Sequence, residues 1–194
     1  MKRLCVFCGS RSGASPVYAD AARGLAELLV RRGCGLVFGG GHVGLMGVIA
    51  DAVLQRGGEV VGVIPQGLVD RELAHPRCTQ MHVTRSMHER KALMADLSDG
   101  FVALPGGYGT FDETFEMLTW SQLGLHQKPM GLLNVAGYFD GLLAFLDHTV
   151  REGFIKPAHR QLLVQAADAE MLLDEMGKMR PGEVQEKWQR LPEP

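Results

Sequence analysis

The sequence predicts a single α/β domain built on a Rossmann-like, doubly wound parallel sheet with helices on both faces. Short apolar, β-rich segments alternate along the chain with segments whose apolar residues recur at helical spacing. The strand-like segments are apolar throughout rather than alternating with polar residues, as is typical of parallel strands buried on both faces. The length of 194 residues suits one domain with one core.

The individual elements follow from this pattern in chain order. The expected strands are Arg3–Cys8, Gly35–Phe38, Val60–Ile64, Phe101–Leu104 and Met130–Val135, with Leu162–Val164 as a candidate short strand. The expected helices are Tyr18–Arg31, Val43–Gln55, Met87–Leu97, Phe111–Leu123, Asp140–Val150 and Asp168–Met179. The domain is expected to span residues 1–180, and the polar, proline-punctuated residues 181–194 to form a loosely ordered tail. Ligands of such a sheet bind beyond the carboxyl ends of its strands.

Composition excludes several classes of function. A hydrophobic fraction of 46% and a net charge of -2 are typical of a globular protein. The basic clusters Arg31-Arg32 and Arg90-Lys91 are too short to neutralise a nucleic-acid backbone, so we expect no nucleic-acid partner. The apolar run Leu4–Cys8 is shorter than a signal-peptide core, and no stretch approaches the ~20 residues that cross a bilayer. We therefore expect a cytoplasmic protein without a membrane partner.

The four cysteines do not form a recognisable metal site. Cys5-x-x-Cys8 has the spacing of a zinc or redox pair, but Cys5 lies within an expected strand, where residues three apart point to opposite faces. No second Cys or His pair has metal-ligand spacing. We expect buried, reduced thiols and neither a metal nor another cofactor.

A first glycine-rich loop, residues 39–47, satisfies the pattern G-x-G-x-x-G and opens a helix. A dinucleotide site would also need an acidic residue at the end of the next strand, but Glu59 lies near the beginning of that strand. This argues against NAD. We expect backbone N–H groups of Gly39, Gly40 and Gly41 to bind phosphate, and the alternative is a tight turn that allows close helix packing.

A second glycine-rich loop, Pro105–Thr110, follows the fourth long strand and leads into a helix. Its three glycines allow an anion to approach the backbone, Thr110 supplies a hydroxyl, and the helix dipole favours negative charge. It lacks the lysine of a triphosphate-binding loop, so a monophosphate fits better. The segment Thr110-x-x-Glu113 also has the form of a capping box without a chemical role. Beside an anion-binding loop, however, Glu113 lies within reach of a sugar held by its phosphate.

An arginine lies on the apolar face of the helix 87–97. Helical spacing places Arg90 on one face with Leu93, Met94 and Leu97. A guanidinium there needs an anionic partner, because an unpaired buried charge is very costly. The alternatives are a structural ion pair and a side chain that extends to solvent. Met87 on the same helix is expected to pack in the core.

These residues resemble a known family. The segment Ser86–Lys91 (SMHERK), followed by Pro105–Glu113 (PGGYGTFDE), resembles the Lonely Guy family of cytokinin-activating phosphoribohydrolases, and the likeness extends from Cys8 to about Ile155. The resemblance implies hydrolysis of an N6-modified AMP to a free base and ribose 5-phosphate, with Arg90 and Glu113 as the catalytic residues. It also implies a homodimer with the site near the subunit interface. Related proteins carry the label lysine decarboxylase, but nothing here marks a pyridoxal phosphate lysine site.

In that family, positions matching Glu72, Lys91, Thr119 and the loop 107–113 contact the nucleotide, and Asp112 stands where many members have Glu. Together with the loops above, the expected substrate-binding residues are Ser10, Gly39, Gly40, Gly41, Glu72, Arg90, Lys91, Gly106, Gly107, Tyr108, Gly109, Thr110, Phe111, Asp112, Glu113 and Thr119.

Several alternatives remain open at the level of sequence. Glu113 has three candidate roles: it could stabilise an oxocarbenium-like state, hold the ribose hydroxyls or activate water. Arg90 has two candidate roles: it could orient the Glu113 carboxylate or bind phosphate. The second functional hypothesis is a non-catalytic carrier of a nucleotide or of the molybdenum cofactor. The third is an NAD-linked oxidoreductase. The physiological base is not fixed by the sequence.

Overall fold

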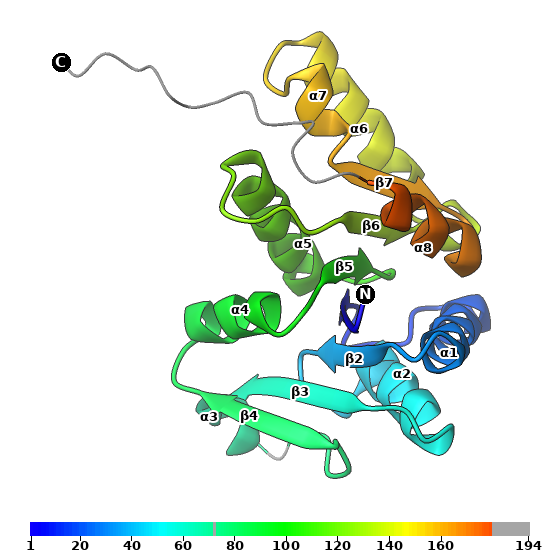
Figure 1. The fold of residues 1–194 in the computed structure, drawn as a ribbon, viewed down its shortest axis with the longest axis vertical. Coiled ribbons are helices and arrows are strands. Elements are labelled where there is room, and N and C mark those ends of the chain that lie inside the picture. Colours follow the sequence, from blue (N-terminus) through cyan, green and yellow to red (C-terminus); the bar gives the residue numbers. More distant parts are fainter. Residues whose placement is uncertain (72, 180–194) are drawn as a thin grey trace, which may run out of the picture.

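The chain forms one seven-stranded sheet whose paired strands are all parallel, with helices on both faces (Figure 1). The computed structural model describes residues 1–71 and 73–179. The strands are β1 (Arg3–Phe7), β2 (Gly35–Phe38), β3 (Val60–Pro65), β4 (Gln80–Thr84), β5 (Gly100–Ala103), β6 (Met130–Leu133) and β7 (Leu163–Ala166). The helices are α1 (Pro16–Arg31), α2 (Gly44–Gln55), α3 (Gln66–Val69), α4 (Met87–Asp96), α5 (Tyr108–Gln122), α6 (Asp140–Arg151), α7 (Pro157–Arg160) and α8 (Ala169–Lys178), with a 3-10 turn η1 (Val135–Gly137). This architecture confirms the predicted fold class.

The strand order β4-β3-β2-β1-β5-β6-β7 places a topological switch point between β1 and β5. The chain builds outward from β1 to β4 and then returns to add β5 on the other side of β1. Cys5 of β1 consequently pairs with Val37 of β2 on one side and with Phe101 of β5 on the other. Ligands of open parallel sheets bind at such a point, beyond the carboxyl ends of the strands.

Two apolar cores lie on the two faces of the sheet. In Figure 1, α1, α2 and α8 cover the right-hand face, and α4 and α5 cover the left-hand face. Cys8 belongs to the core beneath α1, α2 and α8, whereas Cys5 belongs to the core beneath α4, α5 and α6. This confirms that the two thiols point to opposite faces. Burial raises the pKa of both thiols, which disfavours the reactive thiolate.

Three features differ from the sequence-based expectation. Strand β4 was not predicted, because it is an edge strand in which the polar residues Gln80, His82 and Thr84 leave no apolar run. Helix α5 begins at Tyr108, three residues earlier than expected. The short helices α3 and α7 carry too few residues to show a helical period. The predicted tail 181–194 lies outside the described residues.

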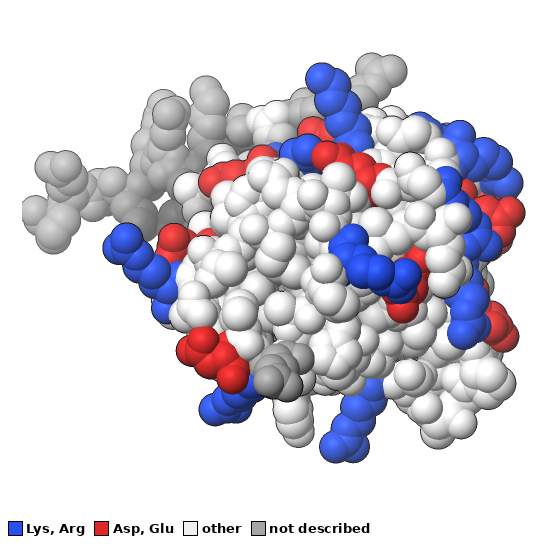
Figure 2. Space-filling model, turned by 90° about the horizontal axis from the view of Figure 1, so that it is seen from below, with Lys and Arg blue, Asp and Glu red and all other residues white. Residues whose placement is uncertain are grey.

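The surface shows no concentration of one charge sign on the face that carries β4 and α3. Lys and Arg side chains are spread around this face with Asp and Glu between them (Figure 2). Among the residues that the structure describes, no helix has the length and apolarity that crossing a membrane requires.

Candidate active site

A cavity of about 230 Å³ lies at the carboxyl ends of β1 and β2, where α4 and α5 approach the sheet. Its walls come from five separate segments of the chain, so the fold assembles them from distant parts of the sequence. The lining residues are Val6, Phe7, Cys8, Ser10, Gly39, Met46, Leu68, Met87, Arg90, Gly107, Tyr108, Gly109, Thr110 and Glu113.

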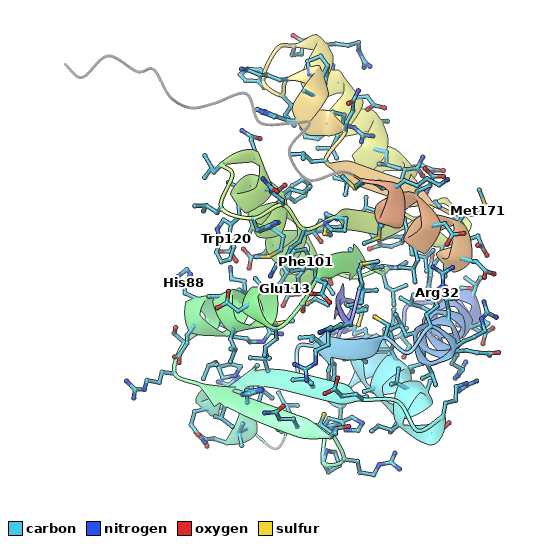
Figure 3. The ribbon with its side chains drawn as sticks, in the orientation of Figure 1. Arg32, His88, Phe101, Glu113, Trp120 and Met171 are labelled. Carbon is cyan, nitrogen blue, oxygen red and sulfur yellow. The ribbon has the colours of Figure 1, made fainter. Side chains whose placement is uncertain are left out.

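A buried ion pair forms one wall of the cavity. Nη1 of Arg90 on α4 donates to Oε1 of Glu113 on α5 at 2.6 Å, and Nε of Arg90 donates to the carbonyl of Val63 at 3.0 Å. Arg90 is 6% exposed and Glu113 is 8% exposed. Glu113 points from α5 toward α4 and the sheet, whereas His88 lies on the outer side of α4 (Figure 3). The apolar face that carries Arg90 is thus matched by an anionic partner, as its charge requires.

The carboxyl of Glu113 lies in an environment unlike that of a surface carboxylate. Burial raises its pKa, and the Arg90 guanidinium acts in the opposite direction. A buried ion pair contributes little net stability, because desolvating two charges offsets their attraction. A desolvated acid with a specific charged partner in a cavity is typical of an active site.

The capping box in this region belongs to α4 and not to α5. Ser86 caps α4 by accepting from the backbone N–H of Glu89 at 3.1 Å, and the Glu89 carboxylate accepts from the N–H of Arg85 at 2.9 Å. Thr110 and Glu113 have no such arrangement, since α5 starts at Tyr108 with Gly107 as its N-cap residue. The capping interpretation of Thr110-x-x-Glu113 is therefore wrong, and Glu113 pairs with Arg90 instead.

The loop after β5 leaves the start of α5 free to bind an anion. The backbone N–H groups of Tyr108, Gly109 and Thr110 donate to no acceptor within the described ranges. A Cβ placed on Gly107 or Gly109 would meet no atom within 4 Å, so both residues border open space. Free N–H groups at a helix start, next to a cavity, form a cradle for phosphate.

Other glycines of this region make room for protein atoms. A Cβ on Gly106 would overlap the Thr110 side chain, and the Gly106 carbonyl accepts from the Tyr138 hydroxyl at 2.6 Å. The N–H of Gly9 donates to the Pro105 carbonyl at 3.1 Å. These contacts fix the loop after β5 against the loop after β1.

A second hollow, of about 550 Å³, lies on the other side of the same loop. It shares Ser10, Gly107 and Tyr108 with the first cavity and adds Arg11 and Tyr18. The N-terminus of α5 therefore borders two hollows that share part of their lining, which together offer room for a ligand larger than a phosphate.

The loop after β2 differs from this arrangement. A Cβ on Gly39 would overlap Nη2 of Arg90, and one on Gly44 would overlap the backbone of Ser10. The N–H of Leu45, in the first turn of α2, donates to the Gly9 carbonyl at 3.0 Å. The surroundings of Gly39 and Gly44 thus agree with the alternative expectation for this loop, which was a tight turn that allows close helix packing. Of the three glycines 39–41, only Gly39 lines the cavity.

Comparison with known proteins places the chain in a family. Residues 46–176 match the family model described as "Possible lysine decarboxylase". The chain is 50% identical over 180 residues to a cytokinin riboside 5'-monophosphate phosphoribohydrolase of Arabidopsis thaliana. The aligned region covers 93% of this chain and 79% of the relative. It is 53% identical, over the same shares of both chains, to a probable enzyme of that name in Oryza sativa subsp. japonica. The chain belongs to this phosphoribohydrolase family.

Solved structures of similar fold come from proteins with other names. The molybdenum cofactor binding protein of Rippkaea orientalis superposes with a TM-score of 0.69 at 21% identity, over 91% of this chain and 96% of that one. The Moco carrier protein of Chlamydomonas reinhardtii gives a TM-score of 0.67 at 21% identity over the same shares. At this level of identity the likeness supports the fold alone.

The structure brings together half of the nucleotide-binding residues that the phosphoribohydrolase resemblance and the loops predict. Those that line the first cavity are Ser10, Gly39, Arg90, Gly107, Tyr108, Gly109, Thr110 and Glu113. Those that do not line it are Gly40, Gly41, Lys91, Gly106, Phe111, Asp112 and Thr119, although Gly106 lines the second hollow. Glu72 lies outside the described residues.

Two predicted positions make contacts that point away from the cavity. The Lys91 ammonium pairs with the carboxylates of Asp112 and Glu116. Thr119 lines a separate pocket beside α6 and α7, and its hydroxyl donates to the Phe115 carbonyl at 2.7 Å.

Sequence reasoning missed the apolar part of the lining. Met87 was expected in the core, but it is 46% exposed and lies at the cavity with Met46 and Leu68. Met46 follows the glycines of the loop after β2, and Leu68 belongs to α3, which carries no periodic signal. Their proximity depends on tertiary packing that no local pattern encodes.

Proposed function

We propose that this chain hydrolyses the N-glycosidic bond of a nucleoside 5′-monophosphate of the N6-modified AMP type, releasing a free purine base and ribose 5-phosphate. The observation that carries the proposal is the buried Arg90–Glu113 pair beside the first N–H groups of α5, which have no acceptor in the described part of the chain. Membership of the phosphoribohydrolase family supports the same reaction.

The phosphate binds at the start of α5. The N–H groups of Tyr108, Gly109 and Thr110 have hydrogen-bonding capacity that the described chain leaves unused, and the helix dipole adds positive potential there. Ser10 borders the same region and offers a hydroxyl. Once the phosphate is fixed, the attached ribose has only a short reach, which extends along the cavity toward Glu113.

The carboxylate of Glu113 faces the ribose. Water supplies an oxygen to the anomeric carbon, the C–N bond breaks, and the base leaves with the bonding electrons and takes up a proton. The state between these events resembles an oxocarbenium ion, and an adjacent carboxylate stabilises its positive charge. Such a carboxylate can also hold the ribose hydroxyls or accept a proton from water.

Arg90 orients Glu113 rather than holding the phosphate. Its Nε is used by the Val63 carbonyl, its Nη1 by Glu113, and its Nη2 lies against the backbone of Gly39. With the guanidinium held on three sides by protein, its role is to fix the carboxylate in one orientation. The sequence left two roles open for Arg90, and this geometry favours orientation of Glu113 over phosphate binding.

The apolar wall accommodates the base. Met46, Leu68 and Met87 lie at the cavity, and flexible methionine side chains adapt to different apolar shapes. They suit a purine with an apolar N6 substituent. We also infer a homodimer, and the exposed apolar side chains of Leu125 and Phe154 support this as part of a contact surface between subunits.

The test is product analysis after incubation with AMP and with isopentenyl-AMP. We expect adenine or the modified base, together with ribose 5-phosphate, from the wild-type chain. A carrier would return the nucleotide intact, and an oxidoreductase would change nicotinamide absorbance instead. Light scattering on the same preparation reads the oligomeric state.

Two variants test the Arg90–Glu113 pair, and Glu113→Gln is the more discriminating of them. It keeps the shape of the side chain and should lower kcat by about 100-fold or more, a size expected for loss of an electrostatic group. Arg90→Ala should also inactivate, but it leaves a buried carboxylate unpaired and costs about 3–5 kcal/mol of stability. His88→Ala, on the exposed side of the same helix, is the matched control. Undiminished base release by folded Glu113→Gln would remove this residue from the mechanism.

A further inference from the structure

The segment between β3 and β4, which includes α3, is anchored by one histidine. Among its described residues, 66–71 and 73–79, only His75 is buried, with 5% of its surface exposed. The ring packs edge-on against Phe38, the last residue of β2, with the ring centroids 6.2 Å apart. Burying a polar ring is costly unless its nitrogens are hydrogen-bonded, so the partners of this ring decide how firmly it anchors the segment.

Both ring nitrogens of His75 have partners. Nδ1 accepts from the backbone N–H of Arg77 at 3.3 Å, so the ring proton lies on Nε2. Nε2 donates to Oδ1 of Asp51 on α2 at 3.2 Å, and the same oxygen accepts from the Arg77 guanidinium. Because both nitrogens are used, the ring is held in one orientation between α2 and the chain that leads into β4.

The backbone around His75 pairs with the first glycine-rich loop. The N–H of His75 donates to the Gly40 carbonyl at 2.7 Å, and the N–H of His42 donates to the Leu73 carbonyl at 3.0 Å. One antiparallel bridge lies between these two bonds. A pairing as short as this is marginal on its own, so its persistence depends on the buried ring beside it.

The two paired segments carry part of the apolar wall of the cavity. The N–H of Leu73 donates to the carbonyl of Leu68 at 3.2 Å, and Leu68 on α3 lines the cavity. On the other segment, a Cβ on Gly41 would meet the terminal methyl group of Met46, a second lining residue, at 2.9 Å. Two of the three apolar side chains that we assign to the base therefore rest against a pairing that the His75 ring holds.

We propose that His75 is a positioning residue that sets how well the site accepts the N6 substituent of the base. It ties the segment before β4 to the first glycine-rich loop, so that Leu68 and Met46 stay in place on the apolar wall, while its own ring lines neither hollow beside α5. The inference rests on the proposed phosphoribohydrolase function. The catalytic pair has other supports, because Arg90 bonds to the Val63 carbonyl and to Glu113.

Steady-state kinetics with two substrates test the positioning role. In His75→Ala we expect KM for isopentenyl-AMP to rise about tenfold through loss of apolar contacts, and KM for AMP, which lacks the substituent, by no more than about twofold. Because the lost contacts bind the ground state and the transition state alike, kcat should stay within about threefold. His75→Gln, whose amide can donate to Asp51, should recover most of the preference. His148→Ala, an exposed histidine beside Glu152 on α6, is the matched control. An equal change with both substrates, or a fall in kcat alone, would overturn the proposal.

Asp51→Ala removes the partner of the ring from its outer side and decides the question if His75→Ala does not fold. The Asp51 side chain is 41% exposed, so its removal leaves the apolar core intact. We expect the same loss of preference for isopentenyl-AMP, at a smaller size. An unchanged preference in this variant would count against the anchor in the same way.

Amide hydrogen exchange gives a readout that needs no turnover. The N–H of His42 donates across the pairing to Leu73, so it exchanges when the pairing opens. We expect its exchange, followed by NMR, to become about tenfold faster in His75→Ala and to return toward the wild-type rate in His75→Gln. An unchanged rate in His75→Ala would refute the inference, because the ring would then not hold the pairing. Absence of base release by the wild-type chain would instead refute the proposed function.

Discussion

The two glycine-rich loops look alike in sequence and differ in what fills the space that their missing side chains leave. After β2, Gly39 faces the guanidinium of Arg90, and Gly44 faces the backbone of Ser10. After β5, Gly107 and Gly109 face open space, and the first N–H groups of α5 stay unpaired within the described chain. Glycine spacing alone does not say what approaches the backbone, and the structure shows which of these glycines face protein atoms and which face open space.

The comparison has a consequence for how the site is built. The packed loop lies against Arg90, Arg90 holds Glu113, and the open loop is the one that we propose binds the phosphate. In the proposed function, one glycine-rich loop therefore supports the Arg90–Glu113 pair, while the other contacts the substrate directly. Substitutions in the two loops should separate these roles.

The largest effect is expected from Gly39→Ala. The new methyl group would overlap Nη2 of Arg90 and displace the guanidinium from Glu113, and a misplacement of about 1 Å can cost about 100-fold in rate. We expect kcat to fall by about that factor, with a loss of stability of about 1–3 kcal/mol from overpacking. Steady-state kinetics and thermal denaturation measure the two effects. Gly141→Ala, on α6 with open space at its Cβ position, is the control. Unchanged kcat would mean that Arg90 tolerates displacement.

An intermediate effect with a different signature is expected from Gly109→Ala. Its methyl group meets no protein atom, so the free energy of unfolding should change by no more than about 1 kcal/mol and should tend to rise. The same methyl would occupy the space in which we propose that the phosphate binds, so KM for AMP should rise about tenfold, equivalent to about 1.4 kcal/mol of binding. A KM equal to that of the wild type would place the phosphate elsewhere and would remove the distinction between the loops.

The sequence predicted the sheet because buried parallel strands have a strong local signature. It failed on β4 because Gln80 and Val83 of this edge strand face solvent, and local pattern then no longer distinguishes strand from loop. It placed Arg90 and Glu113 correctly on facing elements, since a charge on an apolar helix face must have a partner. It could not show which glycines border open space, because that depends on segments as distant as Arg90 and Gly39 meeting in the folded chain.

The smallest effect is expected from Tyr138→Phe, which tests how firmly the open loop is held. The Tyr138 hydroxyl donates to the Gly106 carbonyl at 2.6 Å and ties the loop after β5 to the turn before α6. Removing the hydroxyl costs one hydrogen bond, about 0.5–1.5 kcal/mol, and leaves the ring in its contacts with Tyr18 and Phe139. We expect KM for AMP to rise about twofold to fivefold at unchanged kcat, because phosphate binding needs the loop and the Arg90–Glu113 pair does not. A fall in kcat at constant KM would instead couple this loop to the catalytic pair and would contradict the division of labour between the two glycine loops.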